Sequence, residues 1–181
     1  MSARPDVLLK GGLMSTSVNQ YVAQRAELLA HLVLTRRKDI QLIALGERQD
    51  IGIDLLAQVS KPVMNGQVFP SFGVEVMGTS QPLEDEISAT RYANQWWKHR
   101  QTKGLLLFPI VLLLFSMEND LGYSGWLMEP HVSEESGPSL TRVSPLCMTK
   151  LNKKRVDELV QRVEKWFEAT AEILIKPVPA R

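Results

Sequence analysis

Cysteine is nearly absent from this sequence, because Cys147 is the only one among 181 residues. A single cysteine cannot form a disulfide within the chain, and a structural zinc site needs several cysteine or histidine ligands at close spacing. The histidines, His31, His99 and His131, lie far apart and lack that spacing. These absences exclude an internal disulfide and argue against structural zinc. We therefore expect a protein of a reducing compartment, the cytoplasm.

Strong net charge and long apolar runs are also lacking. The formal net charge is +1, so a contact with nucleic acid would have to come from a local basic patch rather than from the global field. The longest apolar run, 104–115, contains Pro109 and falls well short of the roughly 20 residues that a membrane-spanning helix needs. Residues 1–12 lack the long apolar segment of a signal peptide. We therefore expect no membrane partner.

The composition that is present, 44% hydrophobic and 23% charged, is that of an ordinary globular domain. We expect one domain at 15–172, between a flexible leader at 1–14 and a tail at 173–181. Serine, glutamate, glycine and proline at 130–145 predict a long irregular loop. Apolar spacing predicts an α/β fold, a mixed sheet flanked by helices, with helices at 18–36, 83–100 and 152–171 and strands at 40–45, 51–59, 68–79, 104–115 and 123–128.

Two acidic residues stand out in the predicted hairpin at 49–79. Asp54 lies in the first arm and Glu75 in the second, where the neighbouring residues are apolar. Side chains two apart on a strand share a face, so Gly73, Glu75 and Met77 should point to the same side of the sheet. A buried carboxylate without a partner costs several kcal/mol. Glu75 should therefore lie at a strand end, be paired, or bind a cation.

Five stretches, taken in their order, resemble a known family. They are DIGIDLL, FGVEVMGT, NQWWKH, FPIVLLLFS and YSGWLME, and the resemblance covers about 19–126. Their arrangement is similar to an uncharacterised bacterial domain family of the PD-(D/E)xK, or restriction-endonuclease-like, superfamily. The resemblance implies a single domain with a restriction-endonuclease-like mixed β-sheet flanked by α-helices.

The same resemblance implies a metal site. In that superfamily an acid on the first helix, an Asp at the start of a strand and a Glu or Gln followed two residues later by Lys hold a divalent metal. Asp54 matches the Asp and Glu75 the Glu, which implies Mg²⁺ or Mn²⁺ as the cofactor. Met77 stands where the lysine is expected. A thioether carries no charge and is a poor hydrogen-bond donor, so the departure puts cleavage rather than metal binding in doubt.

The other candidates for the site are weaker. Glu27 is the acid on the first helix, but it lies about 140° from Val22 around the helix and so away from the apolar stripe; Gln20 is a lesser alternative. Asp50 is expected to shape the turn. Arg91 or Lys98 could supply the missing positive charge or contact nucleic acid.

Aromatic and basic clusters have ordinary structural interpretations as well. Trp96 and Trp97 could stack on bases, but we expect at least one of them to anchor its helix to the sheet. The basic cluster Lys150, Lys153, Lys154 and Arg155 is more often a solvated face than a phosphate contact.

Three functions remain open from the sequence. The first is a nuclease-fold protein with impaired catalysis that binds nucleic acid or serves as a subunit of a nucleic-acid-processing or defence assembly. The second is an active Mg²⁺-dependent endonuclease with a displaced basic residue. The third is a protein-interaction module, with a protein partner or a second copy of the chain and with no metal or nucleic-acid role.

Overall fold

A strand that is buried along its whole length forms the centre of the fold. This strand, β4 (Ile110–Ser116), has the apolar sequence expected where helices cover both faces of a sheet. The structure is a computed structural model that describes residues 14–45, 53–63, 68–99 and 107–174. β3 (Ser71–Thr79) pairs parallel with β4 on one side, and β5 (Gly122–Ser133) pairs antiparallel with it on the other.

The remaining strands extend the sheet in both directions. β1 (Ile40–Ala44) and β2 (Leu55–Val59) form an antiparallel meander that ends on β3. β6 (Gly137–Arg142) pairs antiparallel with β5, and the short β7 (Thr149–Lys150) also pairs with β5. In the part of the chain that the structure describes, the sheet therefore has seven strands in the order β1-β2-β3-β4-β5-β6, with β7 off this path.

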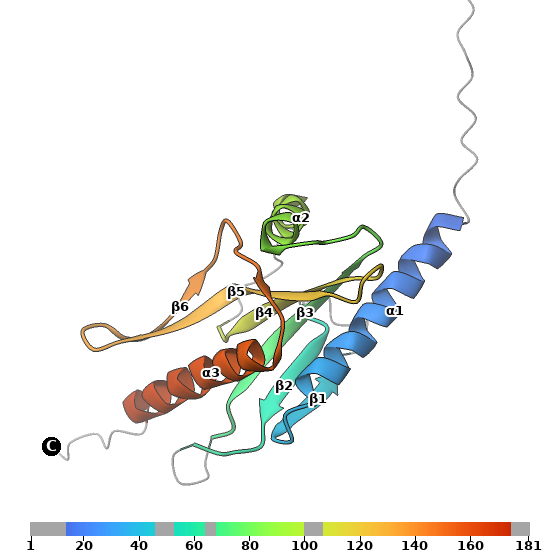
Figure 1. The fold of residues 1–181 in the computed structure, drawn as a ribbon. Helices are drawn as coiled ribbons and strands as arrows, with labels where there is room; N and C mark the ends of the chain where they lie inside the picture. Colours follow the sequence, from blue (N-terminus) through green and yellow to red (C-terminus); the bar gives the residue numbers. More distant parts are fainter. Residues whose placement is uncertain (1–13, 46–52, 64–67, 100–106, 175–181) are drawn as a thin grey trace, which may run out of the picture.

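Helices cover both faces of this sheet (Figure 1). α1 (Met14–Leu34) and α3 (Lys153–Leu174) pack on one face, where they meet Val111, Leu113 and Phe115 of β4. α2 (Glu86–His99) packs on the other face, against Leu112 and Leu114. Because β3 and β4 are parallel, the chain has to cross over between them, and α2 makes that connection. The predicted mixed α/β sheet flanked by three helices is confirmed.

The prediction of a long irregular loop at 130–145 was wrong, because most of this segment forms strands. β5 continues to Ser133, and β6 turns back beside it, with register from Met128↔Arg142 to Ser133↔Gly137. Gly137 has a positive φ of 72° at the start of β6, which glycine adopts readily. The hairpin is largely exposed, so its residues are polar and carry no apolar alternation. The predicted leader and tail lie almost wholly outside the described residues.

Three polar side chains on α2 hold the segment that leads into β7. The Asn94 amide exchanges two hydrogen bonds with the backbone of Leu146, at 2.9 and 2.8 Å. Thr90 Oγ1 accepts from Met148 N at 3.0 Å, and Glu86 Oε1 accepts from Lys150 N at 2.8 Å. The three helix residues are spaced by four positions, a rise of about 6 Å, and their partners are spaced by two positions in an extended segment, a rise of about 6.6 Å. The two spacings match, so every partner lies opposite its helix residue. α2 is therefore tied to β5 through this segment.

We predict that Asn94→Ala lowers the free energy of unfolding by about 2–4 kcal/mol, because it leaves the N–H and C=O of Leu146 without partners in a half-buried place. Denaturant unfolding measures the change. The matched control is Gln95→Ala, which removes an exposed amide from the next position of the same helix. Equal losses in the two variants would contradict the assigned role of the Asn94 contacts.

Candidate functional site

Asp54 joins three strands of the sheet. It lies directly before β2, where its backbone accepts from Leu45 N at 3.0 Å and donates to Val74 O at 2.9 Å. Its carboxylate Oδ2 accepts from Val76 N at 2.7 Å. The side chain thus lies against the backbone of β3 one residue beyond Glu75. A charged acceptor on a backbone N–H makes a strong hydrogen bond, so this contact fixes where the hairpin begins.

Glu75 is almost completely buried, with 2% of its surface exposed. It lies beside Leu112 of β4 in the parallel register, on the α2 face of the sheet. Ile53 and Phe108 cover β3 next to it: a Cβ at Gly73 would lie 2.9 Å from Ile53 Cγ2 and 3.1 Å from Phe108 Cε2. The predicted alternation along β3 is therefore confirmed. The side chain of Glu75 is therefore directed into the layer under α2, where the described core residues are mostly apolar.

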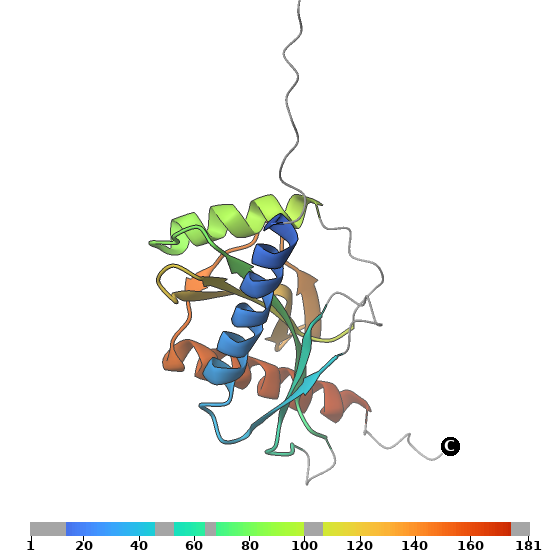
Figure 2. The same ribbon diagram turned by 90° about the vertical axis from the view of Figure 1, so that its right-hand side faces the viewer.

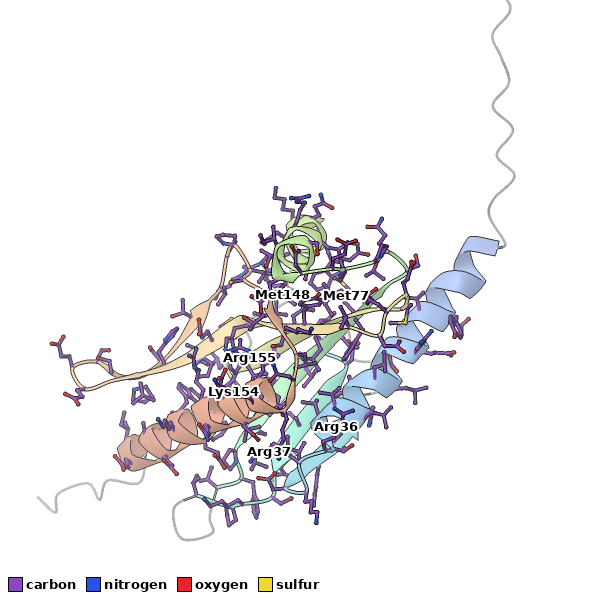
Figure 3. All side chains as sticks on the ribbon, viewed as in Figure 1. Arg36, Arg37, Met77, Met148, Lys154 and Arg155 are labelled. Atoms are coloured by element: carbon purple, nitrogen blue, oxygen red, sulfur yellow. The ribbon has the colours of Figure 1, made fainter. Side chains whose placement is uncertain are left out.

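Met77 is a core residue of the same face. It is 8% exposed and belongs to the apolar cluster under α2, which also contains Leu114 and Met148. Figure 3 shows Met77 and Met148 on the α2 side of the sheet. A flexible thioether fills irregular space in a core, and this is what the position requires. The side chain at position 77 is therefore an apolar thioether rather than the ammonium group of a lysine.

The described residues around Glu75 fit a divalent cation poorly. Mg²⁺ takes six oxygen ligands and keeps several waters, so its site has to be open to solvent. Glu75 is 2% exposed, and one oxygen of Asp54 already accepts from Val76 N. Within the described ranges, no three His, Cys, Asp or Glu side chains come together as metal ligands. The carboxylates of Asp54 and Glu75 would supply only some of the six oxygen ligands that Mg²⁺ takes.

The structure does not place the other candidate site residues in the layer between the sheet and α2, where the Glu75 side chain lies. Glu27 is exposed on α1, whose buried residues pack on the opposite face of the sheet. Gln20 is also exposed on α1. Arg91 and Lys98 are exposed on α2, whereas that helix faces the sheet with Ala89, Ala93 and Trp97. Asp50 lies outside the described residues.

The tryptophan pair serves packing, as expected for at least one member. Trp97 is 9% exposed in the cluster under α2, and the Arg142 guanidinium carbon lies 5.2 Å from its ring centroid. Trp96 is partly buried and stacks on Trp97 with ring centroids 5.9 Å apart. Trp97 therefore has no face open for a base.

One charged centre was not found in the sequence. Arg37 donates to both oxygens of Asp39, at 3.0 and 2.6 Å, and to Asp157 Oδ1 at 2.7 Å. The hydrogen bond from Arg37 is the main cause of a lowered pKa at Asp39. The sequence RRKD at 36–39 places Arg37 close to Asp39, but Asp157 is 120 positions further along the chain, so the sequence did not indicate its contact with Arg37. This centre joins the end of α1 to the first turns of α3.

Comparisons with protein-family models, with curated proteins and with solved structures gave no match for this chain. Among the described helices, none is both long and apolar enough to cross a membrane. The features of this chain that bear on a function are therefore the placement of Asp54, Glu75 and Met77 and their sequence context.

We predict that Asp39→Asn lowers stability at pH 7 and flattens the acid side of the stability profile. The pKa of Asp39 is lowered in the folded protein from its ordinary value of 3.8. Its contribution is therefore fully present above pH 3.8 and is lost as the pH falls through the folded pKa. Asp39 is 34% exposed, so screening limits the loss at pH 7 to about 1 kcal/mol.

The measurement is urea unfolding between pH 2.5 and 7, with Glu134→Gln as the control because Glu134 is an exposed carboxyl of the β5–β6 hairpin. An Asp39→Asn profile parallel to that of the parent protein down to the lowest pH would contradict the role given to the Arg37 contact.

Proposed function

We propose that this chain is a nuclease-fold protein of the PD-(D/E)xK superfamily with impaired catalysis, which binds nucleic acid or serves as a subunit of a nucleic-acid-processing or defence assembly. The observation that carries the proposal is the contact of the Asp54 carboxylate with Val76 N at 2.7 Å, immediately beside Glu75. The backbone positions of the two acids thus lie close together where the start of β2 pairs with β3, in a sequence context that resembles the superfamily. The crossover through α2 to the buried strand β4 supports the same assignment.

The departures from the pattern account for the impairment. In an active site of this type, the metal polarises the scissile phosphate and activates a water. The lysine orients that water and offsets the charge that grows on the phosphate oxygens. Met77 has neither a charge nor a strong donor, and Glu75 is only 2% exposed, whereas a hard cation such as Mg²⁺ usually keeps several waters. Binding without cleavage is the expected behaviour.

An active endonuclease has less support. It would need a positive charge near Glu75 from another position, and the two candidates that the sequence suggests, Arg91 and Lys98, are exposed on α2 rather than directed to the sheet. Their contact with nucleic acid at the outer surface of α2 is compatible with the main proposal.

A protein-interaction module is supported by a different feature. Tyr21, Leu28 and Leu32 of α1 are 59%, 65% and 62% exposed. Their spacing of seven and four residues places them along one side of the helix. Exposed apolar side chains that line up in this way are typical of surfaces that contact a protein partner or a second copy of the chain.

The first test is nucleic-acid binding and cleavage by the whole chain with Mn²⁺. We predict measurable binding of labelled duplex or single-stranded nucleic acid and no cleavage, because the lysine is missing and the metal donor set is incomplete. Gel analysis of the end-labelled strand after long incubation reads out cleavage. Met77→Leu is the matched control for Met77→Lys, and neither variant is expected to cleave.

Each other outcome identifies a different function. Cleavage by the parent protein that Asp54→Asn abolishes would establish the active endonuclease. Cleavage gained only in a folded Met77→Lys variant would mean that the lysine is the single missing part, and it would overturn the poor fit to a metal. No binding of any nucleic acid, together with self-association that Leu28→Glu abolishes, would establish the interaction module.

A further inference from the structure

Basic residues from two distant parts of the chain meet on the face of the sheet that α1 and α3 cover. The C-terminal end of α1 and the N-terminal end of α3 lie side by side in both ribbon views (Figures 1 and 2). The 2.7 Å contact between Arg37 and Asp157 joins them. Figure 3 shows cations from both ends in this region, on the other side of the sheet from Met77. We call Arg36, Arg37, Lys38, Lys153, Lys154 and Arg155 the basic surface.

The basic surface is more positive than the chain as a whole. Three carboxylates pair with or lie among its six cations: Asp39, Asp157 and Glu158. Three positive charges therefore remain in this small region, against a formal net charge of +1 for the whole chain. Such a local excess attracts polyanions even where the overall charge is nearly balanced.

Some of these cations are held in place and others are free to reach outward. Arg37 is fixed by two aspartates, and Arg155 donates to Ser124 Oγ at 3.1 Å. Lys154 is 88% exposed and only 3.8 Å from Glu158, which makes a weak surface pair. Arg36, Lys38 and Lys153 are also exposed. The arginines Arg37 and Arg155 thus support the surface, and the lysines present mobile point charges.

The start of α3 is unfavourable for the stability of the helix itself. Its first turn contains Lys153, Lys154 and Arg155 and no acid. Cations near the positive end of a helix dipole lower the stability of the helix. Asn152 caps the helix by accepting from Arg155 N at 2.9 Å, so the lysines are not needed to begin it. Residues that oppose local stability without a structural return are expected at functional surfaces.

We propose that the basic surface binds the phosphate backbone of nucleic acid without reading its sequence. The choice of nucleic acid rests on the proposed function, but the surface lies on the opposite face of the sheet from Glu75 and Met77. Lysines at the ends of two helices suit phosphates, which they contact as point charges. A membrane surface is the weaker occupant because little apolar area is exposed among these cations: Leu34 is 0%, Ile40 5% and Val156 2% exposed, whereas Leu32, one turn before Arg36, is 62% exposed.

The test is a fluorescence-anisotropy titration of a labelled, random-sequence DNA duplex with the full chain, repeated at several salt concentrations. The variant Lys38→Gln/Lys153→Gln/Lys154→Gln removes three exposed charges. If these three lysines contact phosphates, the slope of log Kobs against log salt should become shallower by about 2.7, and affinity at ~0.1 M salt should fall at least about tenfold. The thermal unfolding midpoint of this variant should equal or exceed that of the parent protein, because two of the substitutions remove positive charges from the N-terminus of α3.

The control variant Arg142→Gln/Arg162→Gln/Lys165→Gln removes the same charge from β6 and from later turns of α3, all at exposed positions. We expect its affinity to stay within about twofold of the parent value. Equal losses in both variants, or a greater loss in the control, would overturn the basic surface while leaving nucleic-acid binding intact. No binding by the parent protein would overturn both proposals. Tighter binding to anionic lipid vesicles than to DNA, lost in the first variant, would assign the surface to membranes instead.

Discussion

A carboxylate in a strand that is covered on both faces is the constraint on which the site depends. β3 lies between β2 and the buried strand β4, and helices close both sides of this part of the sheet. Alternation along β3 directs Val74 toward α1 and α3, so Glu75 has to enter the apolar layer under α2. Burial of a charged group there is expensive, and a protein without a use for it would be expected to place an apolar residue at this position.

In the function that we propose, the site around Glu75 keeps its framework and lacks its catalytic parts. Asp54 still reaches β3, at Val76 N, and so holds the beginning of β2 against the strand that carries Glu75. Met77 completes the apolar layer instead of adding a charge. The charged groups of the molecule are concentrated elsewhere, above all where α1 and α3 meet around Arg37. The two faces of the sheet thus differ in chemistry: one buries an acid, and the other displays lysines.

The sequence predicted the centre of the fold well because burial imposes a pattern there. The run before Ser116 required a strand covered on both faces, and the alternation around Glu75 placed Met77 on the correct side. The sequence did not predict the β5–β6 hairpin, because an exposed hairpin needs no apolar alternation. β6 is a strand because its backbone pairs with β5, and the local sequence does not show that pairing. The three polar side chains of α2 that bind the segment before β7 could have been recognised from the four-residue spacing of Glu86, Thr90 and Asn94. The segment to which they bind could not have been predicted. The Arg37–Asp157 contact joins residues too far apart for any local pattern to connect.

The most direct measurement of the central claim is a crystal of the whole protein soaked in Mn²⁺, with the anomalous signal of the metal recorded around β2 and β3. Our account predicts no manganese between the carboxylates of Asp54 and Glu75, because Glu75 is 2% exposed and the described residues contain no group of three His, Cys, Asp or Glu side chains that could hold a metal. An ordered manganese ion coordinated by both carboxylates would contradict the account and would indicate a metal site that Met77 alone keeps from cleaving.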